Sequence, residues 1–119
     1  MNEHQIQCAF IKWLGYQHPY AAEVIYATPN AGKRTLTQGA YLKAEGMRSG
    51  VPDLCIPIAM QGYSSLYIEL KTPKGSPTSN QIVWIEKLNK HGNLALICRG
   101  LDEAMQAVNE YFKGYSNGR

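Results

Sequence analysis

Asp53, Glu69 and Lys71 are the residues whose types and spacing could do chemistry. Asp53 stands at the start of the apolar run 54–58, which has the length and composition of a buried strand. Side chains alternate between the faces of a strand, so Glu69 and Lys71 leave the run 66–71 on one face and its leucines and isoleucine on the other. If the two runs pair as a hairpin, two carboxylates and one ammonium lie in one small volume.

Such a cluster predicts a metal site, because two carboxylates at close range repel and a divalent cation removes the repulsion. Mg²⁺ is typically held by one or two carboxylates, with water and substrate phosphate at the other positions. A neighbouring lysine can orient or help deprotonate a water whose pKa the cation lowers. Attack of that water on a phosphodiester is the chemistry these residues suit. Taken singly, Asp53 could be a turn residue and the Glu-x-Lys an exposed ion-paired edge.

Further motifs follow in a fixed order along the chain. They are Pro29-Asn30-Ala31-Gly32-Lys33-Arg34, Leu42-Lys43-Ala44-Glu45-Gly46, Gly50-Val51-Pro52-Asp53-Leu54, Ile68-Glu69-Leu70-Lys71, Gln81 ahead of Trp84 and Leu88, and Gly92. The series resembles the VRR-NUC family of the PD-(D/E)xK nuclease superfamily. A lone Glu-x-Lys would carry no such weight, whereas this order spans the chain from Glu3 to Gly92.

The resemblance implies a site and a cofactor. Mg²⁺ or Mn²⁺ would be bound by Asp53, Glu69 and the main-chain carbonyl of Leu70, with Glu3 completing the acidic set directly or through water. Gln81 would belong to the active site, where its amide could bind a water or a phosphate oxygen. Glu3 has the alternative of a surface acid placed against the helix dipole. Gln81 lies three residues after Thr78, which is the spacing of a capping box.

Basic residues precede the central motif. The stretch 33–48 holds four of them against the single acid Glu45. A phosphate backbone beside an acidic site requires such a patch, and the alternative is a solvated helix face. The candidate DNA-binding residues are Asn30, Lys33, Arg34, Lys43, Arg48 and Lys74. Asn30 could equally bond its own backbone in a turn.

Length and composition predict one intracellular domain. The 119 residues can bury a core without staples, and the net charge of +3 permits nucleic-acid binding without demanding it. No apolar run is long enough to cross a bilayer and no signal peptide is visible, so we expect a cytoplasmic protein without membrane contact. The three cysteines lie far apart in apolar segments, and we expect buried free thiols.

The periodicities predict an α/β domain over 1–113 and a disordered tail over 114–119. Expected helices cover 3–14, 36–45 and 78–90, with a last helix capped by Asp102, and expected strands cover 24–27, 54–58, 66–71 and 94–98. Gly15 should end the first helix, and Ile82, Ile85 and Leu88 should form the inner face of the third. Strands this apolar predict a central mixed sheet flanked by helices, in agreement with the restriction-endonuclease-like core that the resemblance implies.

The expected function is metal-dependent cleavage of DNA selected by its shape. Family members that stand alone resemble Holliday-junction resolvases, and a two-fold symmetric four-way junction calls for two active sites, hence a homodimer. The alternative enzyme is a flap, nick or end-directed repair nuclease. The alternative outside enzymes is a DNA-binding module with a degenerate site.

Overall fold

Strands form one mixed sheet at the centre of the computed structural model, which describes residues 1–29 and 36–116. The strands are β1 (Tyr26–Ala27), β2 (Leu54–Ile56), β3 (Leu66–Lys71) and β4 (Leu94–Arg99), in that spatial order. β2 pairs antiparallel with both β1 and β3, while β4 runs parallel to β3. No helix in the described residues is long and apolar enough to cross a membrane.

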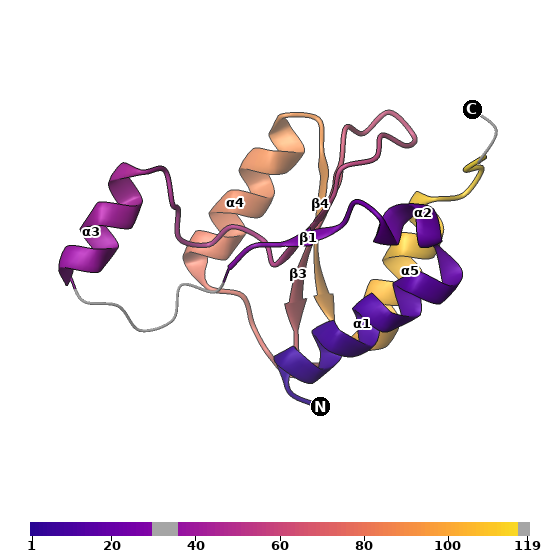
Figure 1. Cartoon of the computed structure of the whole chain (residues 1–119), viewed down its shortest axis with the longest axis horizontal. Coiled ribbons are helices and arrows are strands. Elements are labelled where there is room, and N and C mark those ends of the chain that lie inside the picture. The colour runs from indigo at the N-terminus through magenta and orange to yellow at the C-terminus, as the bar shows by residue number, and fades with distance from the viewer. Residues whose placement is uncertain (30–35, 117–119) are drawn as a thin grey trace.

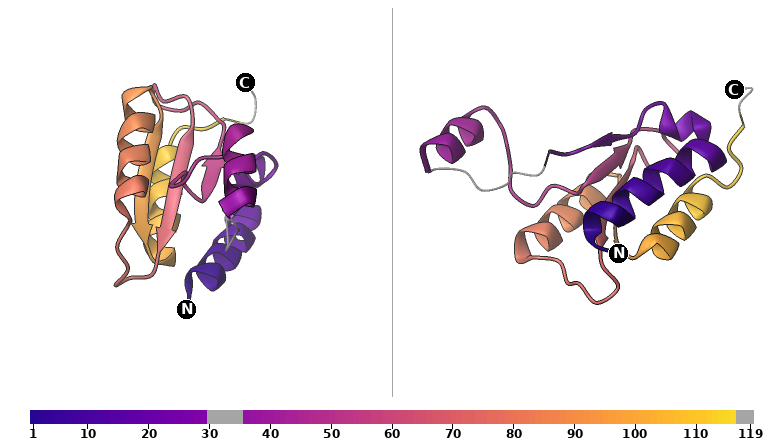
Figure 2. Two further views of the ribbon diagram at one scale, coloured as in Figure 1. Left: turned by 90° about the vertical axis from the view of Figure 1, so that its left-hand side faces the viewer. Right: turned by 60° about the horizontal axis from the view of Figure 1, so that its bottom comes forward.

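Helices cover both faces of this sheet (Figures 1 and 2). They are α1 (Glu3–Gln17), α2 (Pro19–Ala22), α3 (Leu36–Ala44), α4 (Ser79–Lys90) and α5 (Leu101–Tyr111). α1, α2 and α5 lie on one face, α4 lies on the other, and α3 lies further out beyond α4. This arrangement confirms the predicted mixed sheet flanked by helices.

The core lies between the sheet and the α1–α5 layer. Leu66, Ile68 and Leu70 are buried there, and the strand alternation thereby turns Glu69 and Lys71 to the α4 face. The hairpin between β2 and β3 forms as predicted. Its turn is closed by a bridge between Met60 and Tyr63, and Gln61 and Gly62 have positive φ (52° and 87°), as a twisted two-residue hairpin turn requires.

Helix α1 does not end at Gly15 as predicted but continues to Gln17. The stop comes from Pro19, because the residue before a proline is kept out of the helical region, and His18 has φ −139° and ψ 66°. Pro19 then begins the short helix α2, which the sequence pattern did not predict. The predicted strands 24–27 and 54–58 are each shorter, at Tyr26–Ala27 and Leu54–Ile56.

The inner face of α4 is also shifted from the predicted one. Ile82 is 42% exposed, whereas Gln81, Trp84, Ile85 and Leu88 are half-buried. These four follow the i, i+3, i+4, i+7 spacing of one helix face, so a polar residue takes the position expected of the isoleucine. The Thr78 cap and its capping box with Gln81 are confirmed.

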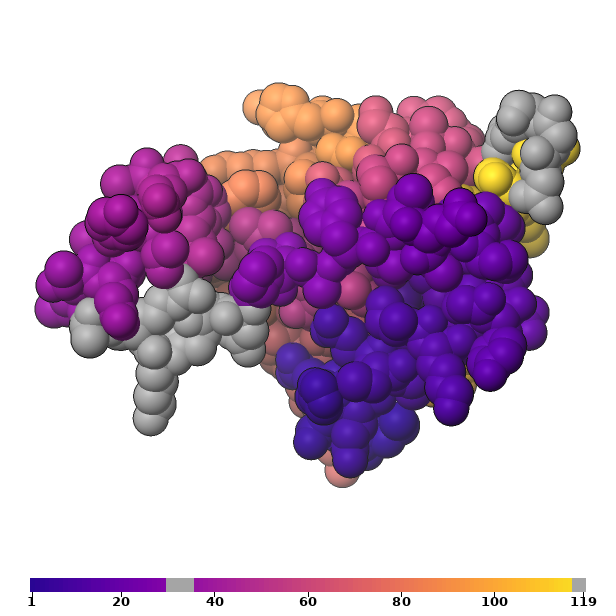
Figure 3. All heavy atoms as spheres, in the orientation of Figure 1, coloured from indigo at the N-terminus to yellow at the C-terminus, as the bar shows by residue number. Residues whose placement is uncertain are grey.

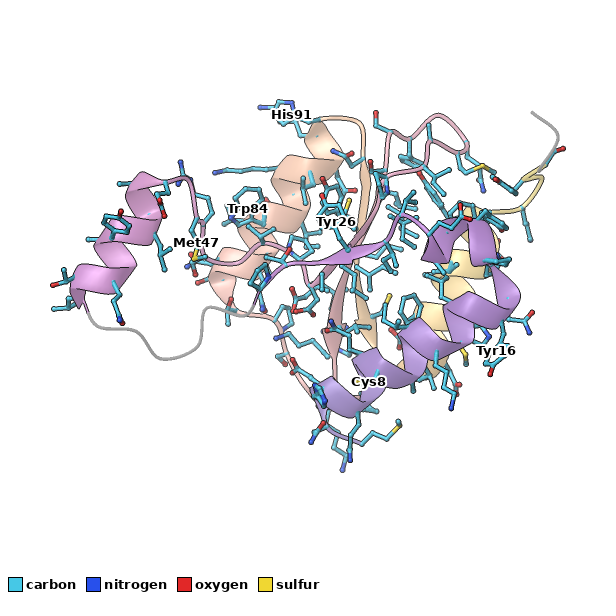
Figure 4. All side chains as sticks on the ribbon, in the orientation of Figure 1. Cys8, Tyr16, Tyr26, Met47, Trp84 and His91 are labelled. Carbon is cyan, nitrogen blue, oxygen red and sulfur yellow. The ribbon has the colours of Figure 1, made fainter. Side chains whose placement is uncertain are left out.

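Three smaller predictions are wrong. Cys8 is exposed, because α1 buries Ile6, Phe10 and Leu14 and leaves the thiol on the outer face (Figure 4). Gly100 rather than Asp102 is the N-cap of α5, and Asp102 lies inside the first turn. The packed structure also continues past residue 113, since the ring of Tyr115 stacks on that of Tyr20 with centroids 3.7 Å apart.

Helix α3 projects from the rest of the molecule (Figure 3). It has no buried residue, and it makes no extensive contact with another helix or strand of the described chain. The radius of gyration is 14.9 Å, against about 13.5 Å for a compact chain of this length. The surface of α3 is therefore accessible to a binding partner.

Candidate active site

The carboxyl groups of Asp53 and Glu69 meet at the start of β2 and near the end of β3. The β2–β3 pairing brings the two residues opposite each other, since Leu54 is the partner of Ile68. Asp53 Oδ2 accepts a hydrogen bond of 2.7 Å from the main-chain N–H of Leu70. The convergence that strand alternation and a hairpin predict is therefore present.

The side chain of Glu69 is only 2% exposed, and its polar neighbours are Asp53, Lys71 and Gln81. Its Oε2 accepts a hydrogen bond of 3.1 Å from Gln81 Nε2 and lies 3.8 Å from Lys71 Nζ. Its Oε1 is buried and has no hydrogen-bond partner among the described residues. A buried acceptor without a partner is costly, so this oxygen is placed to meet a ligand.

Burial raises the pKa of Glu69 from 4.5 to about 8. The negative charge of the nearby Asp53 acts in the same direction, while the charge of Lys71 lowers the pKa. Glu69 therefore holds a proton at neutral pH when no cation is present. A cation bound at this carboxyl group would compete with that proton.

Gln81 forms the capping box with Thr78 and contacts Glu69 at the same time. Its Oε1 accepts from the N–H of Thr78 (2.8 Å), and its own N–H donates to Thr78 Oγ1 (3.2 Å). Its Nε2 remains to donate to Glu69. The capping box thus fixes the amide that holds Glu69, so the two readings of this residue do not exclude each other.

A proline opposite Leu70 removes one hydrogen-bond donor from the main-chain carbonyl of that residue. Continuing the register of β2 and β3 sets Pro52 opposite Leu70. Alternate pairs of an antiparallel ladder exchange both backbone hydrogen bonds, but proline has no N–H to donate in either kind of pair. The Leu70 N–H turns to Asp53 instead, and the Leu70 carbonyl gains no donor from Pro52.

The carboxylates of Asp53 and Glu69 and the main-chain oxygen of Leu70 fit a hard divalent cation that takes water at its other positions. Mg²⁺ takes few protein ligands and keeps several waters. In residues 1–29 and 36–116, no three His, Cys, Asp or Glu side chains lie close enough together to hold a metal ion. Glu3 is exposed and lines the same cleft as Asp53 and Glu69.

The cleft has a volume of about 610 Å³. One wall is the segment 45–50, which directly follows the end of α3 and is called the root of α3. Glu3, Asp53, Glu69 and Gln81 line the rest of the cleft with their neighbours. Gly50, with φ +92°, lies so close to α4 that an added Cβ would be 2.7 Å from the carbonyl carbon of Asn80. Asn80 Nδ2 also donates to Ser49 Oγ at 3.2 Å.

This junction fastens the root of α3 to the turn of α4 that carries Gln81. Neither Ser49 nor Asn80 was predicted as a site residue, because nothing in the sequence indicates which distant loop a helix terminus meets. Arg99 lies next to Lys71 in the register of β3 and β4, but its Nε donates to the carbonyl of Gly75 at 3.1 Å and the residue does not line the cleft.

The predicted DNA-binding residues divide into two groups. Lys43, Arg48 and Lys74 are exposed; Arg48 lines the cleft and donates to the carbonyls of Lys43 and Met47. Arg48 therefore also caps the end of α3. Asn30, Lys33 and Arg34 lie outside the described residues.

Comparisons with known proteins agree with this geometry. The family model of the VRR-NUC domain matches residues 1–102. A solved structure described as a VRR_NUC domain protein is similar to this chain with a TM-score of 0.84 and 28% identity, over 95% of this chain and 89% of that one. No curated protein matches. The chain belongs to the VRR-NUC domain family, which gives it a nuclease-type function in DNA processing.

Proposed function

We propose that this chain is a Mg²⁺- or Mn²⁺-dependent, structure-specific DNA endonuclease that hydrolyses phosphodiester bonds. The observation that carries the proposal is the buried Oε1 of Glu69, which has no hydrogen-bond partner in residues 1–29 and 36–116, beside the carboxyl group of Asp53. A binding module with a degenerate site would have no use for two repelling carboxylates in the base of a cleft.

Each residue of the site has a role that its contacts support. Asp53, Glu69 and the Leu70 carbonyl would hold the ion, and Glu3 would contact one of its waters. The bound ion would supply a water of lowered pKa and neutralise charge on the phosphate. Lys71, held 3.8 Å from Glu69, would orient the attacking water or stabilise the negative charge of the transition state. Gln81 would fix the Glu69 carboxylate.

The exposed basic residues would bind the phosphate backbone on both sides of the cleft. Lys43 and Arg48 lie on or beside the α3 wall, and Lys74 lies in the loop after β3. Asn30, Lys33 and Arg34 remain candidates from the sequence. Such contacts position DNA without reading its sequence, so the substrate would be chosen by shape.

The proposed substrate is branched DNA, with the four-way junction first among the candidates. Cutting such a junction symmetrically requires two active sites, and a C₂ homodimer supplies them. A flap or nick would need only one. A panel of labelled duplex, single-strand, flap, nicked and four-way junction DNA, incubated with Mg²⁺ or Mn²⁺, would show which is cleaved.

Three alanine variants test the catalytic assignment. Asp53→Ala and Glu69→Ala should abolish cleavage and weaken Mn²⁺ binding in titration calorimetry. Lys71→Ala should lower the cleavage rate by about 100-fold or more while keeping most of the Mn²⁺ affinity, because the lysine is not a ligand.

Glu110→Ala and Lys113→Ala are matched controls, since these residues form an exposed ion pair at the end of α5. Both controls should keep full activity and metal binding. Full cleavage by a purified Asp53→Ala, Glu69→Ala double variant would overturn the assignment, and an absence of Mn²⁺ binding with and without DNA would favour the degenerate module.

A further inference from the structure

We propose that Tyr41 of α3 stacks on an unpaired nucleobase of the DNA bound in the cleft. Helix α3 would thereby distinguish DNA that has unpaired bases from a continuous duplex. This inference rests on the proposed nuclease function and adds the chemical feature by which the substrate is recognised. It assigns a role to the one helix that the fold itself leaves uncovered in the described chain.

The first observation is the exposed face of α3. Tyr41 is 69% exposed and lines an open niche of about 430 Å³ together with Thr37, Gln38 and Leu42. None of these four side chains is charged. A planar aromatic side chain beside an apolar niche is the kind of surface on which a nucleobase stacks. Because α3 makes no extensive contact with another helix or strand in the described part of the chain, the packing of those elements does not require Tyr41.

The second observation is continuity with the active site. Leu42 lines both the niche and the catalytic cleft. A DNA strand bound in the cleft can therefore extend into the niche along one continuous surface. The junction of Ser49 and Gly50 with Asn80 holds the root of α3 against the first turn of α4, which sets the position of the niche relative to Glu69.

The third observation is charge. α3 contains Lys43 and no acidic residue, and the adjoining wall of the cleft carries Arg48 and the single acid Glu45, so two positive charges face one negative charge. A polyanion is attracted to such a surface. A second copy of the chain is the other occupant that an apolar helix face could take, but the basic residues and the shared wall favour the nucleic acid that the cleft is proposed to hold.

Stacking also matches recognition by shape. Every base has a flat face, so an aromatic platform accepts unpaired bases with little sequence preference. A base inside an intact duplex must first be unstacked and unpaired, at a cost that is least for bases already single-stranded. Tyr41 would thus favour DNA with unpaired bases near the cut, at a branch or flap, without reading the sequence.

The test compares Tyr41→Ala and Tyr41→Phe with the matched control Tyr16→Ala. Tyr16 is 76% exposed and lies on α1, at the opposite end of the molecule from α3 (Figure 4). Binding is measured in EDTA, so that no cleavage occurs, to a labelled duplex and to the same duplex carrying a single-stranded flap. 2-Aminopurine in the first unpaired positions reports stacking.

Tyr41→Ala should weaken binding of the flap DNA by about tenfold, leave the affinity for the duplex unchanged and abolish the 2-aminopurine response. Tyr41→Phe should behave as the unmodified chain, because it keeps the ring, and Tyr16→Ala should change nothing. Circular dichroism should show all three variants folded.

Other outcomes separate the two proposals. If the unmodified chain binds flap DNA better than duplex and Tyr41→Ala keeps that preference, the inference fails while the nuclease function stands. Equal loss on both DNAs would also overturn it. A shift from dimer to monomer in Tyr41→Ala, seen by sedimentation, would assign the face to a second copy instead. A chain that binds no DNA at all would overturn both proposals.

Discussion

At the scale of single residues, the site is organised around the Glu69 carboxylate. Strand alternation and a two-residue hairpin are local rules, so the sequence sufficed to bring Asp53, Glu69 and Lys71 together. How far the pKa of Glu69 is raised could not be predicted from the sequence, because the largest cause is burial, which depends on how α4 covers the sheet. The shift of the inner face of α4 from Ile82 to Gln81 has the same origin, since an apolar pattern alone favours the isoleucine.

Metal-free protein should become less stable as the pH rises, and Glu69 is the cause. Its pKa is about 8 in the folded chain and 4.5 as the ordinary value, so between these values the folded state holds a proton that the unfolded state has lost. The stabilisation is complete below pH 4.5 and is lost as the pH rises through about 8. The slope for one proton is at most about 1.4 kcal/mol per pH unit.

Urea denaturation of the unmodified chain and of Glu69→Gln, at several pH values in EDTA, measures this contribution. Gln keeps an oxygen for the hydrogen bond from Gln81 and cannot titrate, so the difference between the two proteins isolates Glu69 from other titrating groups. Saturating Mn²⁺ should flatten the pH dependence of the unmodified chain. Equal slopes for both proteins in EDTA would contradict the raised pKa.

At the scale of elements, the first turn of α4 links the site to α3. The capping box of Thr78 and Gln81 was readable from a spacing of three residues, as was β3 from its alternation. The contact between Gly50 and Asn80 joins residues thirty positions apart in the sequence, and no local pattern encodes it. α2 escaped prediction because its helix depends on Pro19 starting a turn directly after α1 has ended.

Gly50→Ala should destabilise the fold and lower cleavage together. The new Cβ would lie 2.7 Å from the backbone of Asn80, in a residue with φ +92°, so the turn that carries Gln81 must move. The matched control is Gly62→Ala, because Gly62 has φ +87° and nothing within 4 Å of an added Cβ. The control should cost only the backbone strain, roughly 1–3 kcal/mol, and keep cleavage at wild-type rates under native conditions.

Urea midpoints and initial cleavage rates would be measured side by side for the two glycine variants. A larger loss of stability in Gly50→Ala, with a lower rate measured well below its midpoint, would fit the tight approach to α4. If Gly50→Ala and Gly62→Ala lose equal stability and neither loses activity, the junction between α3 and α4 does not position the site.

At the scale of the whole molecule, the sequence predicted the sheet and its layers but not the projection of α3. The sequence predicted a helix over 36–45 but not what covers it, and Leu36 is 95% exposed. Periodicity shows that a helix has an apolar face and does not say what covers it. Architecture followed from the pattern of strands, whereas the placement of a helix outside the core did not.

We expect the purified chain to sediment as a dimer at working concentration, as the proposed cut of a two-fold symmetric junction requires. Cleavage of a junction should then yield paired, symmetric nicks within the lifetime of one complex, which a supercoiled cruciform plasmid reports as linear product. A monomer that cuts flaps and leaves the cruciform nicked on one strand would favour the flap or nick nuclease instead.

The two ends of the segment between β1 and β2, which contains α3, lie side by side. The N–H of Thr28 donates to the carbonyl of Asp53 at 2.8 Å, so residues 29–52 depart from β1 and rejoin β2 with their ends already side by side. Closing a loop of another length costs little more entropy. Helix α3 itself can therefore be lengthened, trimmed or exchanged while the sheet and the junction of Ser49 and Gly50 with Asn80 persist, which offers a route to new substrate preferences on an unchanged catalytic site.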